Sequence, residues 1–131
     1  QLKGIAVISR RPKFIISLVA LACALSSFPA RAAALWKVVS VEERMMVDAT
    51  VEITAGKISG KGGCNSYSAP AKFVRGMTEI GPVVATKMAC DQLESEQAFF
   101  LALERARAFR VEGSNMTLFD AGGKPLILLS R

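Results

Sequence analysis

Short runs in which hydrophobic and polar residues alternate follow one another from residue 35 onward, a pattern that is typical of half-buried β-strands. The clearest run spans 50–54. The run 57–61 repeats its period after a tight Ala-Gly turn, which predicts a β-hairpin. An earlier run at 35–41 is rich in β-branched residues and contains a tryptophan, so it predicts the first strand.

The second half of the chain contains one helical pattern among further strand patterns. Residues 91–108 carry apolar side chains at helical spacing and begin with Asp91 and Glu94, which match a capping box. The apolar face of this helix comprises Phe99, Phe100, Leu103 and Ala106. Further extended segments are expected at 45–47, 73–84, 109–111, 116–119 and 126–129. This order of strands, helix and strands, joined by short turns, predicts an α+β domain with a bent antiparallel sheet and the helix packed on one side.

Residues 1–34 have the layout of an export signal. A basic stretch precedes 14–30, which is apolar and uncharged, and several alanines then allow cleavage near residue 32 or 34. There are two alternatives: the apolar stretch stays as a short membrane anchor, or Ala20-Leu21-Ala22-Cys23 acts as the lipobox of a bacterial lipoprotein. Lipidation of Cys23 would tether the protein to a membrane surface. We therefore expect an exported protein, either periplasmic or attached to the outer or inner membrane.

The charge of the chain is concentrated in this leader. The formal net charge is +6, but five basic residues and no acidic ones lie before residue 35. Without them, 12 basic residues face 11 acidic ones. A nucleic-acid-binding protein would carry its positive charge on the folded part, so we expect no nucleic-acid partner.

The centre of the chain combines glycines with two cysteines. The run from Gly60 to Gly63 weakens a plain strand and indicates a bulge or a close approach of backbone to another group. It lacks the phosphate-binding loop pattern, although it contains Lys61. The sequence has no histidine, which removes Ser-His-Asp and Cys-His catalysis and most zinc sites. We expect no metal and no cofactor.

Cys64 and Cys90 allow three interpretations. A disulfide suits an exported domain and would stabilise it by roughly 3 kcal/mol through the entropy of the closed loop. The alternatives are two buried thiols or a redox pair, although neither cysteine lies in a Cys-x-x-Cys motif.

Three polar residues near the cysteines have plain structural interpretations. Asn65 has the side chain of a turn residue, which bonds nearby backbone and tolerates left-handed geometry, and contact with a ligand is the alternative. Tyr67 is expected at the edge of the core with its hydroxyl at the surface, and a ring on which a ligand stacks is the alternative. Glu96 lies near the helix start, where the helix dipole favours a carboxylate or where it can bond a neighbouring loop.

The pattern Gly-x-x-Gly-Cys-Asn-x-Tyr, followed by Thr-x-Met-x-Cys and a glutamate on a helix, resembles the META domain of HslJ-like proteins. The residues that carry the resemblance are Gly60, Gly63, Asn65, Tyr67, Thr86, Met88 and Glu96, together with the two cysteines. The resemblance covers 35 to about 129, so the expected domain spans 35–131. One departure is Ser68-Ala69-Pro70, where the family has a glycine soon after the tyrosine.

The resemblance implies a strongly curved antiparallel sheet, a partial barrel, with one main helix packed against it. It also implies an exported bacterial protein, often a lipoprotein, that is linked to heat shock and antibiotic stress and has no established enzymatic activity. We therefore expect a non-enzymatic cell-envelope module that binds an envelope protein, a lipid or a small apolar ligand. The alternative is a thiol-disulfide redox protein that uses Cys64 and Cys90.

Overall fold

The structure is a computed structural model that describes residues 33–46 and 48–131. The predicted export signal, the alternative membrane anchor and the lipidation site at Cys23 lie outside the described residues, apart from the last two positions of the leader. The elements are β1 (Ala34–Val41), β2 (Arg44–Met45), β3 (Thr50–Thr54), β4 (Lys57–Lys61), β5 (Ser66–Val74), β6 (Met77–Ile80), β7 (Val84–Ala85), α1 (Leu93–Arg105), β8 (Ala108–Glu112), β9 (Asn115–Phe119) and β10 (Pro125–Ser130).

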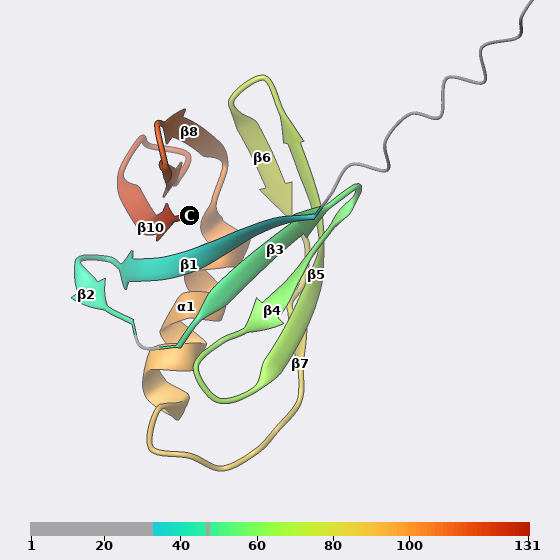
Figure 1. The fold of residues 1–131 in the computed structure, drawn as a ribbon, viewed down its shortest axis with the longest axis vertical. Helices are drawn as coiled ribbons and strands as arrows, with labels where there is room; N and C mark the ends of the chain where they lie inside the picture. The colour runs from blue at the N-terminus through green and yellow to red at the C-terminus, as the bar shows by residue number, and fades with distance from the viewer. Residues whose placement is uncertain (1–32, 47) are drawn as a thin grey trace, which may run out of the picture.

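The strands form one antiparallel sheet that closes on itself (Figure 1). Its order is β1-β3-β4-β5-β6-β8-β9-β10, and β10 pairs back to β1 from Lys37↔Ser130 to Val41↔Ile127. The predicted curved antiparallel sheet with one main helix is therefore confirmed. The expected partial barrel is instead a closed one, because the last strand returns to the first.

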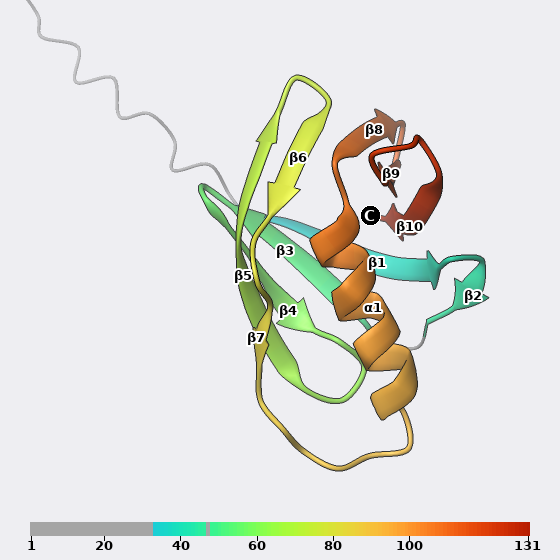
Figure 2. The same ribbon diagram turned by 180° about the vertical axis from the view of Figure 1, so that it is seen from behind.

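The barrel is joined most weakly between β6 and β8. Their ladder contains one residue pair, Met77↔Ala108. Two backbone hydrogen bonds extend it: Thr78 N–H donates to Arg107 O at 3.0 Å, and Phe109 N–H donates to Gly76 O at 2.9 Å. The helix α1 precedes β8 and packs against β1, β6 and β10, so it covers this side of the sheet (Figure 2).

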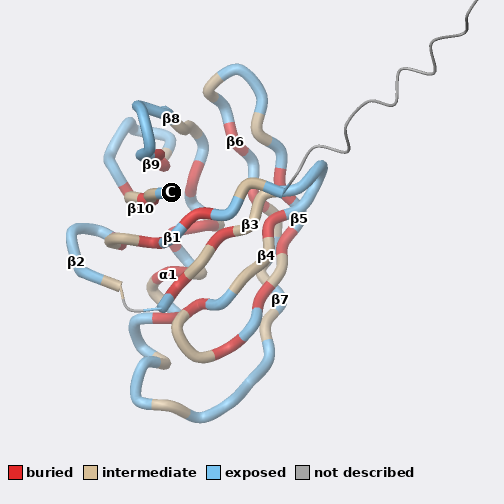
Figure 3. Tube along the Cα trace, in the orientation of Figure 1, coloured by how far each residue is buried: buried red, intermediate tan, exposed pale blue. Residues whose placement is uncertain are grey.

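The core fills the inside of the barrel and the buried face of α1 (Figure 3). Inward-facing strand residues alternate with exposed ones, as a half-buried sheet requires. The largest fully buried apolar side chains are Phe99, Ile58, Leu103, Leu118, Leu126, Ile127, Leu129 and Val51. The concave face of the sheet is thus occupied by the protein's own side chains.

The helix is shorter than the sequence predicted. Its N-cap is Gln92, which makes no side-chain capping hydrogen bond, so the capping box of Asp91 and Glu94 is wrong. Asp91 lies one residue too early to cap, because a capping side chain must belong to the residue directly before the helix. At the other end Ala106 is already extended and Ala108 begins β8. In the described part of the chain no helix is long and apolar enough to cross a membrane.

One long strand begins earlier than expected. β5 starts at Ser66, whereas the pattern predicted extended chain only from residue 73. Pro70 lies inside β5 opposite Lys57, and its ring nitrogen has no proton to donate to the ladder. The breaks predicted at Gly76 and at Gly81 are confirmed, since β6 lies between them.

Candidate functional site

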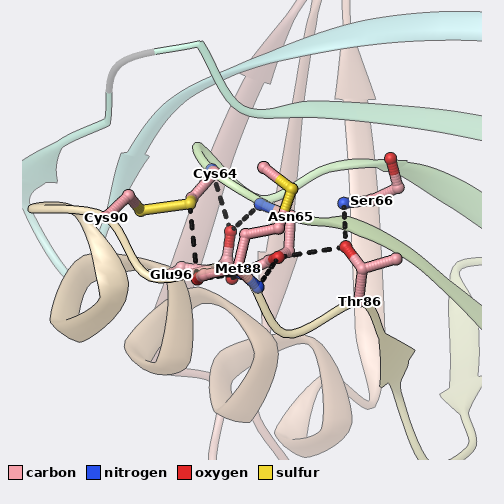
Figure 4. The surroundings of a disulfide bond; sticks show 7 residues. All are labelled: Cys64, Asn65, Ser66, Thr86, Met88, Cys90 and Glu96. Carbon is pink, nitrogen blue, oxygen red and sulfur yellow. Dashed lines mark hydrogen bonds between the residues drawn. A yellow bond between two sulfur atoms is a disulfide. The ribbon is translucent and has the colours of Figure 1, made fainter.

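The motif residues from three separate segments meet at one place (Figure 4). The loop after β4 contributes Cys64 and Asn65, the segment between β7 and α1 contributes Thr86 and Met88, and α1 contributes Glu96. Hydrogen bonds connect all five, and a disulfide closes the cluster on one side. We call this cluster the motif network.

Glu96 is the acceptor at the centre of the motif network. It is 2% exposed, although it lies in the first turns of α1. One carboxylate oxygen accepts the backbone N–H groups of Cys64 at 2.9 Å and Asn65 at 2.6 Å, and the other accepts the Asn65 side-chain amide at 2.6 Å. Burial raises the pKa of Glu96, but the donors from Asn65 and Cys64 outweigh it and hold the pKa below its ordinary value. Of the two expectations for Glu96, the bond to a neighbouring loop is the one that the structure forms.

Asn65 links the segment before α1 to the helix. Its side-chain oxygen accepts the backbone N–H of Met88 at 2.6 Å and the hydroxyl of Thr86 at 3.0 Å, while its amide donates to Glu96. The amide also reaches the Met88 carbonyl at 3.3 Å. The expectation of a local turn residue is wrong, because these partners lie more than 20 positions away and Asn65 is 2% exposed.

The glycines before Cys64 allow the loop to approach the helix and its neighbouring strand. A Cβ atom on Gly62 would lie 2.7 Å from the Phe100 ring and 2.8 Å from Glu96 Cγ. A Cβ on Gly60 would lie 2.8 Å from the Thr50 hydroxyl, and Gly60 has a φ of 155°. Gly63 has a φ of 113°, which favours glycine. The predicted close backbone approach is confirmed.

Tyr67 supports the motif network from the core. Its ring is buried against Phe99 and Phe100, with centroids 5.5 Å and 5.2 Å away. Its hydroxyl donates to the Thr50 carbonyl at 2.7 Å, so the expected hydroxyl at the surface is wrong. Burial raises the pKa of Tyr67 far above its ordinary value.

Cys64 and Cys90 form a disulfide, with their Cα atoms 6.4 Å apart. Both cysteines are partly buried. The disulfide interpretation therefore agrees with the structure, and the two buried thiols do not. The Cys64 sulfur also lies 3.7 Å from the Met88 carbonyl oxygen, a contact without a hydrogen bond because a disulfide sulfur carries no proton.

A groove of about 580 Å³ lies directly over the motif network, between the segment around β7 and the helix α1. We call it the β7–α1 groove. Its apolar lining comprises Val83, Ala85, Met88, Ala89, Leu93 and Phe100, and its polar lining comprises Asn65, Thr86, Lys87, Glu96 and Gln97. The side chain of Met88 is 59% exposed here, while the Met88 backbone is bound on both sides by Asn65.

The hydrogen bonds of the motif network are suited to holding the surface of the β7–α1 groove in one shape. The Glu96 carboxylate accepts three donors, and Asn65 uses both its oxygen and its amide. Within residues 33–46 and 48–131, no group of three or more His, Cys, Asp or Glu side chains could hold a metal ion.

Residues 32–131 match the META domain family. The chain belongs to this family. The resemblance seen in the sequence is thus confirmed. No curated protein matches the chain.

Two solved structures resemble this META domain. An NMR structure of a protein matches with a TM-score of 0.56 and 19% identity, over 72% of this chain and 86% of its own. An NMR structure of a protein from Burkholderia xenovorans matches with a TM-score of 0.56 and 21% identity, over 76% of this chain and 78% of its own. At these identities the likeness shows a shared fold.

Sequence reasoning missed two residues that shape the site. Phe100 was assigned only to the apolar helix face, yet it lies against Gly62 and lines the β7–α1 groove. Glu104 was not singled out, yet its carboxylate accepts the Val83 N–H at 2.8 Å and fixes the segment beside the helix. Phe100 lies four positions after Glu96, on the same face of the helix, which is the signal that could have found it.

Proposed function

We propose that this META domain is a non-enzymatic binding module of the bacterial cell envelope, and that the β7–α1 groove holds an extended segment of a partner protein. One observation carries the proposal. The motif residues form a hydrogen-bonded network around the buried Asn65 and Glu96, directly beneath an exposed groove whose lining is mainly apolar.

The motif network gives the groove a fixed shape. Asn65 holds the Met88 backbone at its N–H and its carbonyl, and the disulfide fixes Cys90 two residues later. The Met88 side chain is thereby directed into the solvent beside Phe100 and Leu93. A site that is ordered before binding loses less conformational entropy when a partner arrives.

The backbone beside the groove favours an extended peptide as the occupant. Thr86 N–H donates to Ser66 O at 3.0 Å, on the β5 side of the segment. Val83 N–H points the other way, to Glu104 of the helix. Backbone groups alternate along an extended chain, so the N–H and C=O of Ala85 face the groove with Val83. An added strand can pair there while its side chains contact the apolar lining.

The cell-envelope location is supported by two features. The disulfide between Cys64 and Cys90 suits an oxidising compartment outside the cytosol. The leader has the basic, apolar and alanine-rich parts of an export signal. The link to heat shock and antibiotic stress comes from the family resemblance, and it makes stressed cells the place to look for the partner.

A thiol-disulfide redox role for Cys64 and Cys90 is the alternative function, and the disulfide itself is the observation that favours it. This role requires a reactive cysteine whose thiol pKa is depressed in the reduced, folded protein. Alkylation of the reduced protein across neutral pH distinguishes the two functions. A binding module gives slow alkylation of both cysteines, whereas a redox protein gives one rapidly modified thiolate.

Photo-crosslinking in the living cell tests the proposed groove. A benzophenone amino acid replaces either Gln97, which lines the groove, or Ser95, which is exposed on another face of α1. We expect one discrete protein adduct from position 97 and none from position 95, and Met88→Asp in the same chain should abolish it. Equal adducts from both positions, or none from position 97, would contradict the proposal.

A further inference from the structure

The barrel end opposite the β7–α1 groove carries its own exposed apolar surface. β1 begins at this end beside the β3–β4 turn at 54–57, and the β5–β6 hairpin extends beyond them to its turn at 74–77 (Figures 1 and 2). A cavity of about 510 Å³ connects Ala34 with both the β3–β4 turn and the end of β5. We call this the exit end, because the chain that precedes β1 departs from the barrel there.

The tip of the β5–β6 hairpin presents two apolar side chains to solvent. Val74 and Met77 form the last cross-strand pair, and they are 60% and 62% exposed. Arg75 and Gly76 between them both have positive φ, which makes the turn tight. Leu35, at the start of β1, adds a third exposed apolar side chain at the exit end.

Basic side chains lie on the strands and turns near this apolar tip. The segments 54–57 and 72–79 contain Lys57, Lys72 and Arg75, all exposed, against one acid, Glu79, which lies opposite Lys72. A further cavity of about 390 Å³ beside the tip is lined by Lys72, Val74, Met77, Thr78, Glu79 and Arg107. Apolar side chains with a basic rim match a surface of acyl chains and anionic headgroups.

The sequence places an apolar stretch close to the same end. Residues 14–30 are apolar and uncharged, and three residues separate them from Ala34. Even fully extended, this connection spans no more than about 14 Å. In the alternative in which this stretch stays as a membrane anchor, the membrane therefore faces the exit end of the barrel.

We propose that the exit end rests on a bilayer with anionic headgroups, with Val74 and Met77 inserted among the lipids and Lys57, Lys72 and Arg75 against the phosphates. This surface leaves the β7–α1 groove at the far end free for a partner. The proposal is independent of the groove, because it uses different residues and predicts binding by the folded domain alone.

Vesicle flotation of residues 33–131, with the disulfide formed, tests the proposal. This part of the chain contains every strand of the closed barrel and α1, so it is a complete folding unit. We expect binding to vesicles that contain phosphatidylglycerol, little binding to phosphatidylcholine alone, and release at high salt, since screening removes the attraction of headgroups for basic residues.

Two methionines give a matched pair of variants. Met77→Asp should lower binding to the anionic vesicles about tenfold or more, because it replaces a side chain that is buried in the bilayer. Met88→Asp, at a methionine of nearly the same exposure in the groove, should leave it unchanged. The Lys72→Gln/Arg75→Gln variant should bind about 25-fold more weakly, at roughly fivefold for each basic residue.

Several outcomes would overturn the proposal. They are equal loss in the two methionine variants, no binding of the unmodified domain, and equal binding to neutral vesicles. Self-association that Met77→Asp removes, without vesicle binding, would assign the tip to a second copy of the chain instead. Far-UV circular dichroism of each variant shows whether the barrel is intact, and Arg75→Lys, which keeps the charge, should bind as the unmodified domain does.

Discussion

Replacing Glu96 with glutamine removes the charge at the centre of the motif network and keeps the size of the side chain. The carboxylate accepts three N–H donors in a site that is almost fully buried. A glutamine side chain has one acceptor oxygen and an NH2 group that is itself a donor. If its oxygen faces the amides of Cys64 and Asn65, its NH2 group faces the side-chain amide of Asn65, and one donor is left without an acceptor.

The expected loss in the free energy of unfolding follows from these three hydrogen bonds. A hydrogen bond to a charged group contributes about 1.5–3 kcal/mol, a neutral one about 0.5–1.5 kcal/mol, and a buried donor left without a partner costs about 1–3 kcal/mol. Two weakened bonds and one unsatisfied donor therefore lower the free energy of unfolding by about 3–5 kcal/mol. For a domain of this size, each kcal/mol corresponds to about 4–8 °C in Tm, so Glu96→Gln should melt at least about 12 °C below the unmodified protein.

The stabilisation that the Glu96 carboxylate contributes depends on pH, and it is lost as the pH falls. The pKa of Glu96 in the folded protein is below its ordinary value of 4.5. A group of this kind contributes its full stabilisation above the unfolded pKa and loses it as the pH falls through the folded pKa. The difference between the unmodified protein and Glu96→Gln should be complete at pH 7 and should shrink below about pH 4.5 as the carboxylate becomes protonated.

Urea unfolding of the oxidised protein, followed by the fluorescence of the buried Trp36, measures these free energies at pH 7 and at acidic pH. Glu94→Gln is the matched control, since Glu94 is an exposed acid in the first turn of the same helix. It should lose about 0.3–1 kcal/mol from the helix dipole. The reasoning is refuted if the two variants differ by less than about 0.5 kcal/mol, the usual range of surface substitutions, or if the difference does not change with pH.

Two further predictions concern the covalent and steric supports of the site. Replacing Cys64 and Cys90 with serine should lower the free energy of unfolding by about 3 kcal/mol in urea, through the entropy of the released loop; an unchanged midpoint would show that the disulfide does not restrain the unfolded chain. Gly62→Ala should lower it by about 1–3 kcal/mol in thermal unfolding, because its methyl group would overlap Phe100. Gly122→Ala, whose nearest neighbour would be a side-chain oxygen at 3.4 Å, serves as its control, and equal melting of the two would contradict the steric argument.

The pattern of hydrophobic and polar residues predicted those elements whose conformation depends mainly on residues that are neighbours in the sequence. The hairpin of β3 and β4 follows from alternation and a glycine turn, and the existence of α1 follows from its apolar face. The glycine run predicted a close backbone approach, although the partner of Gly62, the Phe100 ring, lies 38 positions away. Periodicity and backbone freedom are properties of neighbouring residues, so they can be read without knowing the fold.

The predictions that were wrong concern residues whose partners lie far along the chain. Asn65 was expected to bond locally, and Tyr67 to reach the surface, but Met88 and Thr50 are their partners. The helix begins only after Gln92, and the residues before it are fixed by distant groups, Met88 by Asn65 and Cys90 by the disulfide. Tertiary bonds of this kind override a local capping signal.

The sequence by itself determined that this chain forms a β-rich domain with one helix, that its motif residues belong together, and that its leader concentrates the positive charge. Only the tertiary structure decided that the sheet closes through β1 and β10, that Glu96 accepts the backbone N–H of Asn65, and that the β5–β6 turn and the segment between β7 and α1 lie at opposite ends. The physical reason is that periodicity records which side of an element is buried. Which distant group completes each hydrogen bond depends on how the whole chain packs.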